Sequence, residues 1–223
     1  MTEIQAAALA DLRVRVVALI GAFDPATLDG PAAATPEWRV RDVLAHMVGV
    51  SEDIVHGRVE NIASDEWTAA QVDKRRDVTT DDLLAEWAEF GPQFEQLLAG
   101  APELIAGQAV FDAATHEHDV RTALGRPGAR MSDAMEVSWD WFVGTRAAAG
   151  LPTIRFVTER GDETLGAGTP EFVVHAPRFE ILRAITGRRT ESEMAGYGWE
   201  PAPDPACLIV GELFTIRAES LGE

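Results

Sequence analysis

The sequence contains a single cysteine, a single lysine and no long run of apolar residues. With only Cys207, an internal disulfide is excluded, and the chain suits a reducing compartment, for which we expect the cytoplasm. Lys74 lies in the polar run 73–77, which predicts a solvated loop and excludes a buried Schiff-base lysine. No apolar segment approaches the ~20 residues that cross a bilayer, and the first residues lack the basic and apolar blocks of a signal peptide.

Positive charge is also scarce, because 19 lysine and arginine residues stand against 37 aspartate and glutamate residues, for a net charge of −18. Nucleic-acid affinity depends on positive contacts to phosphates, and an anionic bilayer repels an acidic surface. The charge therefore argues against nucleic acid and membranes as partners. It neither requires nor forbids a homodimer.

The first ~125 residues have the apolar periodicity of amphipathic helices. Gly91-Pro92 should bend or interrupt one of them, since proline lacks the backbone N–H. Four such helices with mostly short connections predict an antiparallel four-helix bundle. We expect the helices over residues 4–22, from Thr35-Pro36 (cap and first turn) through residue 50, after Thr79-Thr80-Asp81-Asp82 through residue 97, and over roughly 104–124.

The pattern changes after Gly150, where alternating apolar residues replace helical periodicity. The fold class is therefore predicted as α+β, with a helical bundle over residues 1–148 and a smaller α+β domain over 149–223 that closes over it. Strands are expected at 153–159 and 171–175, a turn at 160–163, and helices at 132–148, 178–186 and 208–220.

Two stretches of the expected bundle supply a candidate metal site. Asp112 and His116 are four positions apart, so a helix places them on one face, and His46 comes from a separate helix. Two histidines and a carboxylate leave one position for water or substrate, as in a catalytic zinc site. His118 is excluded because it lies ~200° around the helix from His116, whereas Asp119 is placed to hold the His116 imidazole. Spacing alone leaves a second interpretation open, in which both histidines are simply buried and hydrogen-bonded.

Three other residues with reactive side chains receive structural interpretations. His56 is predicted to be solvated, and His175 is expected at the end of a strand. Cys207 has no neighbouring histidine and is predicted to pack rather than to react.

Three segments resemble a known family. The segment Trp38-Arg-Val-Arg-Asp-Val-Leu-Ala-His46 resembles the second helix of the DinB-like family that includes mycothiol-dependent maleylpyruvate isomerase. Residues 112–127 place His-x-x-Asp and an Ala-Leu-Gly ending after a carboxylate, which is similar to the family's second motif, and residues 179–189 resemble its C-terminal region. The resemblance implies a DinB-like bundle with His46, Asp112 and His116 as metal ligands. Family members usually carry Glu where this chain has the shorter Asp112.

The resemblance also implies a chemistry, in which zinc activates the thiol of mycothiol for isomerisation or transfer on a small electrophile. Arg183 is the candidate for binding a substrate carboxylate, with a packing role as the alternative. Two other classes remain open. One is a metal-dependent hydrolase of a small amide or ester with Glu117 or Asp119 as base, and the other is a non-catalytic metal- or ligand-binding protein.

Overall fold

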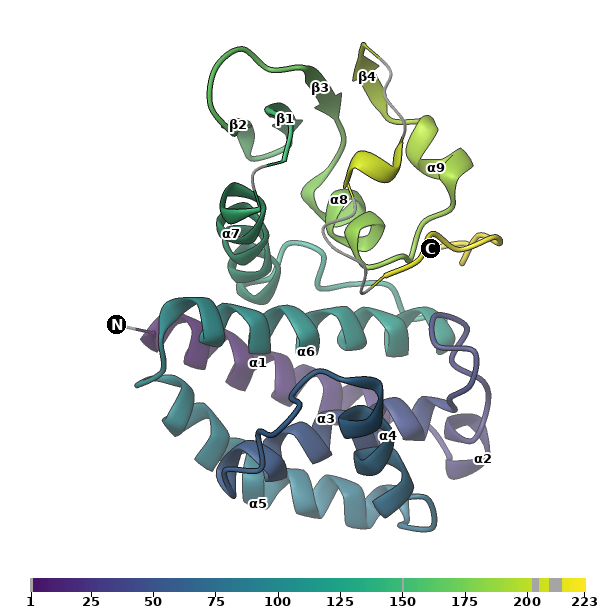
Figure 1. The fold of residues 1–223 in the computed structure, drawn as a ribbon. Coiled ribbons are helices and arrows are strands. Elements are labelled where there is room, and N and C mark those ends of the chain that lie inside the picture. The colour runs from purple at the N-terminus through teal and green to yellow at the C-terminus, as the bar shows by residue number, and fades with distance from the viewer. Residues whose placement is uncertain (1, 150, 202–204, 209–213) are drawn as a thin grey trace. The chain divides into compact units, whose positions relative to one another are not determined.

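The computed structural model describes residues 2–149, 151–201, 205–208 and 214–223, which fall into two compact units, Met1–Gly128 and Ala129–Glu223 (Figure 1). The first unit is helical throughout its regular elements. Its helices are α1 (Glu3–Ile20), α2 (Pro25–Leu28), α3 (Val40–Val55), α4 (Asp65–Lys74), α5 (Thr80–Leu98) and α6 (Glu103–Ala123).

Four long helices of the first unit close a bundle. Helix α1 packs against α5 and α6, and α3 packs against the same two helices, so each long helix has two neighbours. Their facing side chains are apolar and buried, among them Leu12 of α1, Val43 of α3, Trp87 of α5 and Val110 of α6. The expected four-helix bundle is confirmed. Because α3 and α6 are neighbours, residues 46, 112 and 116 come from adjoining helices.

Helix α3 begins later than the sequence suggests. Trp38 donates its backbone N–H to the Thr35 carbonyl at 2.8 Å, so residues 35–38 form a turn rather than a capped helix start. The helix starts at Val40, where the Asp42 carboxylate accepts the Arg39 backbone N–H at 2.9 Å. The prediction of Thr35 as the N-cap was therefore wrong. The Asp42 carboxylate accepts the Arg39 backbone N–H at the start of the helix instead.

The Gly91-Pro92 pair does not interrupt α5, which is continuous from Thr80 to Leu98. A Cβ at Gly91 would lie 2.5 Å from Cδ of Arg13, so the glycine lets this side chain of α1 cross close to α5. The expected interruption was wrong because packing against α1 favours the helix over the local preference of proline.

The polar run 73–77, expected as a solvated loop, begins in a helix at Asp73 and Lys74 and continues as a turn over residues 75–77. Lys74 is the last residue of α4, which packs on α3. The Ser64 hydroxyl caps this helix by accepting the Trp67 backbone N–H at 3.2 Å. Ion pairs from Lys74 and Arg75 to Glu52 of α3 favour the helix over the loop that polarity suggested.

The second unit combines helices with a small sheet. The strand order is β2-β1-β3-β4, with β1 antiparallel to β2 and parallel to β3, and β3 antiparallel to β4. Trp139, Phe142 and Phe156 pack edge to face at centroid distances of 5.4–5.7 Å and form its buried aromatic core. The elements are α7 (Asp133–Ala148), β1 (Ile154–Thr158), β2 (Gly161–Leu165), β3 (Phe172–His175), α8 (Arg178–Ile185), α9 (Glu191–Ala195), β4 (Gly198–Glu200) and a 3₁₀ turn, η1 (Pro205–Leu208).

Two sequence expectations for this unit differ from the structure. Residues 161–165, expected in part as a turn, form strand β2, whose first residue Gly161 has φ of 117°. A helix over 208–220 was expected, but residues 214–220 are not helical and Arg217 bridges Thr190, while 209–213 lie outside the described residues. The helical expectation was wrong over 214–220 because this segment pairs with the α9 region instead.

The two compact units divide after Gly128, twenty residues before the boundary expected at residue 148. Helix α7 is grouped with the second unit because it packs on α8 and β2. Within the described parts of the chain, none of the helices combines the length and the apolar character that crossing a bilayer requires.

Candidate metal centre

The side chains of His46, Asp112 and His116 meet between α3 and α6. His46 Nε2 lies 3.5 Å from Asp112 Oδ2, and His116 Nε2 lies 3.7 Å from Asp112 Oδ1. One ligand atom from each residue falls within 4.8 Å of the other two. Tetrahedral zinc, with bonds of about 2.0–2.1 Å, separates its ligand atoms by about 3.4 Å. The two nitrogen–oxygen distances are close to that spacing, each to a different oxygen of Asp112, so the short carboxylate lies beside both imidazoles.

The cluster is buried on its histidine side and open on its carboxylate side. The side chains of His46 and His116 are 4% and 10% exposed, whereas that of Asp112 is 42% exposed. The Trp38 ring lies against both imidazoles, with centroids 5.4 Å from His46 and 6.0 Å from His116. A ligand can therefore approach along Asp112, while aromatic surface covers the imidazoles.

The outer nitrogens of both imidazoles are already occupied. Nδ1 of His116 is 3.2 Å from Oδ2 of Asp119, as the sequence suggested, and Nδ1 of His46 is 2.8 Å from Oε1 of Gln71. When Nδ1 carries the hydrogen, the lone pair stays on Nε2, the atom that faces Asp112. Two imidazole nitrogens and one carboxylate form a donor set that fits zinc and related divalent cations.

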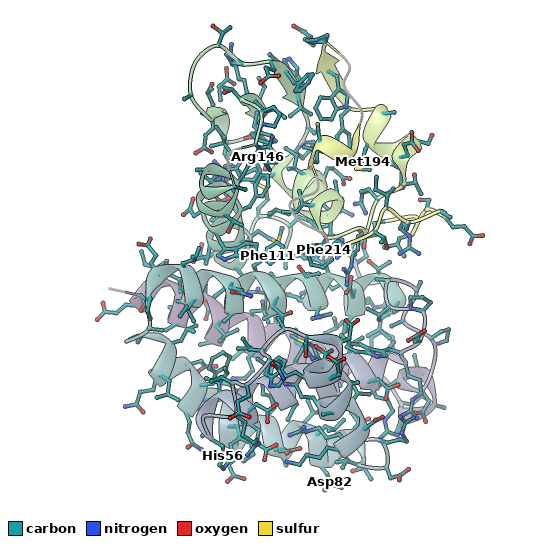
Figure 2. The ribbon with its side chains drawn as sticks, in the orientation of Figure 1. His56, Asp82, Phe111, Arg146, Met194 and Phe214 are labelled. Atoms are coloured by element: carbon teal, nitrogen blue, oxygen red, sulfur yellow. The ribbon has the colours of Figure 1, made fainter. Side chains whose placement is uncertain are left out.

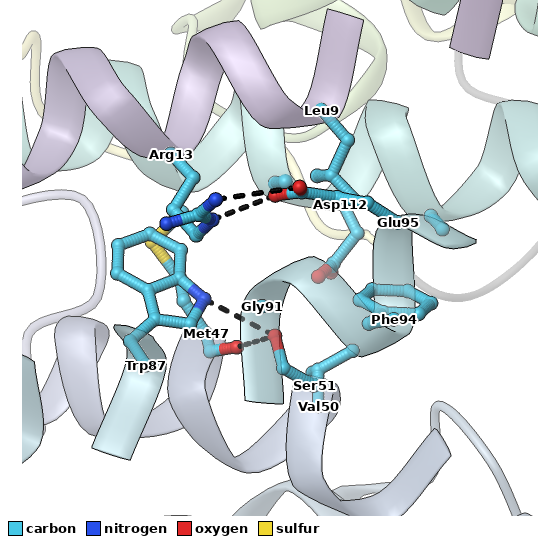
Figure 3. A pocket seen from close by; sticks show the side chains of 12 residues that line it. Leu9, Arg13, Met47, Val50, Ser51, Trp87, Gly91, Phe94, Glu95 and Asp112 are labelled. Atoms are coloured by element: carbon cyan, nitrogen blue, oxygen red, sulfur yellow. Dashed lines mark hydrogen bonds and ion pairs between the residues drawn. The ribbon is translucent and has the colours of Figure 1, made fainter. Parts of the chain in front are cut away.

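Asp112 also borders a small cavity inside the bundle (Figure 3). The Arg13–Glu95 ion pair, with Nε to Oε1 at 2.6 Å, and the Trp87 Nε1–H bond to Ser51 Oγ at 3.1 Å line its walls. Its volume of about 20 Å³ holds a single water molecule and no substrate. This cavity therefore does not admit a substrate, whereas the exposed side of Asp112 is accessible from solvent.

The remaining histidines lie outside this cluster. His118 is buried on α6 and is not part of the His46–Asp112–His116 group, in agreement with its position around the helix. His56 is exposed at the end of α3, as expected (Figure 2), with Nδ1 2.9 Å from the Glu52 carbonyl oxygen. His175 is exposed at the end of β3.

Glu117, a candidate base for hydrolysis, is held by two arginines. Arg15 binds both its carboxylate oxygens, at 3.0 and 2.8 Å, and Arg121 binds Oε1 at 3.0 and 2.8 Å. The side chain is buried and joins α1 to α6. These bonds give Glu117 a structural role and leave it poorly suited to accept a proton from water.

Arg183 is buried on α8 in the second unit and binds a carboxylate of its own chain. Its Nε lies 3.0 Å from Oε2 of Glu223, and its Nη2 binds the other oxygen. Arg189 also binds Glu223, through Nη1 at 2.7 Å, and uses Nε to bind Glu180 at 2.6 Å. The geometry suits carboxylate recognition, with the Glu223 side chain as the present partner.

Sequence reasoning missed Gln71 and the contact of the Trp38 ring with both imidazoles. Gln71 was missed because α4 was not expected, although Ser64 followed by Asp65 and Glu66 is a typical helix start that would have indicated it. Trp38 belongs to the segment that carries the family resemblance, but nothing in its spacing indicates that its ring covers both imidazoles.

Comparison with known proteins gives two matches. A family model described as the mycothiol maleylpyruvate isomerase N-terminal domain matches residues 9–176. A crystal structure of a histidine-to-alanine mutant of mycothiol-dependent maleylpyruvate isomerase is similar with a TM-score of 0.63 and 12% identity, over 92% of this chain and 96% of that chain. At this identity the likeness establishes the fold alone. No curated protein matches the chain.

Proposed function

Since this chain belongs to the mycothiol maleylpyruvate isomerase family, we propose that it is an enzyme that binds zinc through His46, Asp112 and His116. Its reaction is isomerisation of, or thiol transfer to, a small electrophile, with mycothiol as cosubstrate. The observation that carries the proposal is the convergence of two imidazole Nε2 atoms and one carboxylate, with both Nδ1 atoms engaged elsewhere.

The three ligands fit the electrostatic needs of thiol chemistry. A divalent cation held by His46, Asp112 and His116 would lower the pKa of a coordinating thiol, so that thiolate would be present near neutral pH. His46 and His116 are neutral ligands and Asp112 carries one negative charge, so the ligands leave one of the two positive charges uncompensated. This remaining charge favours a thiolate over a neutral thiol.

The protein side chains position the reaction rather than take part in bond making. Isomerisation requires a thiolate sulfur to add to one carbon of a conjugated double bond. The π electron pair moves onto the conjugated carbonyl oxygen, and the former double bond becomes a rotatable single bond. Elimination of the same thiolate then restores the double bond in the other geometry and returns the thiol unchanged. Trp38 limits water access on the imidazole side, and the exposed edge at Asp112 admits the reactants. Transfer shares the addition step and ends when the resulting enolate takes a proton from solvent, or it proceeds by displacement, in which the sulfur–carbon bond forms as the leaving group departs with its electron pair.

The alternative functions have less support. Hydrolysis needs a free general base, but Glu117 binds two arginines and Asp119 holds the His116 imidazole. A structural metal site is usually closed by four protein ligands, whereas the side chain of Asp112 is 42% exposed and three ligands converge. Both features favour a catalytic centre.

Arg183 is proposed as the residue that binds a substrate carboxylate. Its guanidinium already binds a carboxylate through two nitrogens, so a substrate carboxylate would take the place of Glu223. We further propose the cytoplasm as the location of the reaction, because a low-molecular-weight thiol stays reduced there.

Metal analysis of the purified protein tests this proposal. We expect about one zinc ion per chain in the wild type and loss of the metal in His46→Ala and His116→Ala, with folding retained. Activity toward maleylpyruvate should require both the metal and added mycothiol. Unchanged metal content in both variants, or turnover without a thiol, would contradict the proposal.

A further inference from the structure

The side chain of Gln71 connects the metal centre to a carboxylate outside it. Gln71 lies on α4, is 2% exposed, and has its amide between two residues of α3. Its Oε1 is 2.8 Å from Nδ1 of His46, and its Nε2 is 2.8 Å from Oδ2 of Asp53. A buried amide that satisfies both of its ends in this way has a defined orientation.

The Asp53 carboxylate determines which way the amide points. A carboxylate only accepts hydrogen bonds, and Asp53 also accepts one from Nε of Arg58 at 2.7 Å. The NH₂ group of Gln71 must therefore face Asp53, and its carbonyl oxygen must face His46. An oxygen at 2.8 Å requires the hydrogen of His46 to be on Nδ1. The Nε2 lone pair is then available toward Asp112, 3.5 Å away.

The approach of α4 that brings Gln71 to this position depends on Gly49. A Cβ at Gly49 would lie 2.5 Å from Cβ and 2.7 Å from Cγ of Gln71, closer than real side chains approach. On the same side of α4, Lys74 and Arg75 each reach Glu52 of α3 at 2.7 Å. The glycine permits the contact between the helices, and the ion pairs hold it.

We propose that Asp53 and Gln71 act as a positioning relay that fixes the tautomer and ring orientation of His46 for metal binding. The effect of the relay on metal binding rests on the proposed function, whereas its hydrogen bonds do not. His116 is oriented by a carboxylate, Asp119, whereas His46 is oriented by a neutral amide whose direction a second residue sets. Both imidazoles therefore carry their hydrogen on Nδ1, but a different residue accepts it in each case.

The metal-free protein offers a direct test, because the relay competes with Asp112 for the His46 proton. Without Gln71, the nearby Asp112 carboxylate favours the hydrogen on Nε2. Two-bond ¹H–¹⁵N spectra, recorded across the pH range in which the ring shifts stay constant and indicate a neutral ring, report which nitrogen is protonated. We expect Nδ1–H in the wild type and a shift toward Nε2–H in Gln71→Met. Gln93→Met, at an exposed glutamine on α5, is the matched control and should leave the tautomer unchanged.

Metal affinity gives the second readout, by competition with a chromophoric chelator. Loss of a partner that orients a ligand weakens metal binding about 10–100-fold, so the zinc Kd should rise by that factor in Gln71→Met and stay constant in Gln93→Met. If the wild type binds no zinc, the proposed function fails, and the tautomer measurement still decides the relay. A wild-type His46 protonated on Nε2, or an unchanged tautomer and Kd in Gln71→Met, would overturn it.

Asp53→Asn provides a second test of the relay. It is needed if Gln71→Met does not fold, which the absence of a cooperative unfolding transition would show. Asparagine can donate to Gln71 Oε1, which lets the amide turn its NH₂ group toward His46. The relay then predicts more Nε2–H and a weaker zinc affinity. If both measurements match the wild type, Asp53 does not set the direction of the amide and the relay is refuted.

Discussion

The reach of Asp112 depends on how closely α6 lies to α3. Small residues are buried on α6 beside it, including Ala113 and Ala114, and short side chains at a contact allow helices to approach. Its carboxylate oxygens consequently lie 3.5 and 3.7 Å from the two Nε2 atoms, although the side chain is one methylene shorter than glutamate. The difference from the usual family residue therefore does not by itself remove the site.

Replacements at Asp112 test whether this reach suffices. We expect Asp112→Asn to weaken zinc binding at least about tenfold, because it removes the only negative charge among the three ligands. Asp112→Glu should change the Kd by no more than about threefold, since the aspartate already reaches both histidines. Chelator competition measures both variants. A gain of more than tenfold in Asp112→Glu would show that the shorter carboxylate limits the site.

The close contact at Gly49 predicts that replacing this glycine by alanine lowers the free energy of unfolding, the opposite of the usual effect in a helix. Alanine normally stabilises a helix interior by about 0.5–1 kcal/mol relative to glycine. At Gly49 the added Cβ would meet Gln71 at 2.5 Å, so overpacking should destabilise the first unit by about 1–3 kcal/mol. Gly144→Ala on α7, where a Cβ meets nothing within 4 Å, should stabilise instead. Denaturant unfolding compares them, and a stabilised Gly49→Ala would contradict the close contact.

At the scale of helices, the contact between α3 and α4 depends on the charge of Glu52. Burial alone would raise the pKa of Glu52, but hydrogen bonds from Lys74 and Arg75, together with Arg58, lower it to about 2. Arg75 also pairs with Glu86, and Arg58 with Asp53, so the group is a network of both signs. Because the folded pKa is below the ordinary value of 4.5, the stabilisation is complete above pH 4.5 and is lost as the pH falls toward 2.

Comparison with Glu52→Gln isolates this contribution. Between pH 6 and pH 3 the wild type should lose roughly 1 kcal/mol more unfolding free energy than the variant, which is about half of the full linkage value because solvent screens the exposed Lys74 partner. Denaturant titrations at several pH values measure the difference. Equal pH dependence of the two proteins would show that Glu52 does not hold the helices together.

The sequence predicts helices and strands well where one apolar face is buried. It predicts them poorly where contacts with other elements determine the local structure. Helices α1, α5 and α6 follow their apolar periodicity, and His46, Asp112 and His116 could be brought together from spacing and resemblance. Helix α4 escaped notice because its stability comes from a cap and from ion pairs to α3, and Gln71 was missed with it. The segment 214–220 has a helical pattern but pairs with residues near α9 instead.

At the scale of the whole molecule, the site and its supporting residues belong to one unit. The three proposed ligands, together with Gln71 and Asp119, all lie within residues 1–128. The likeness to the solved isomerase structure, however, covers 92% of the chain and so includes both units. We infer that the first unit suffices for metal binding, because every proposed ligand and its hydrogen-bond partner lies within it.

Two fragments test the division of the chain. A fragment of residues 1–128 should unfold cooperatively and bind zinc with a Kd within about threefold of the full chain, because it contains every ligand and partner. A fragment of residues 1–148 adds α7 without its partners, so Trp139 and Phe142 lose the Phe156 contact and expose apolar surface. We therefore expect this longer fragment to bind a hydrophobic dye and to aggregate. If instead 1–148 is monomeric with a protected Trp139 while 1–128 is unfolded, α7 belongs to the bundle and the boundary lies after residue 148.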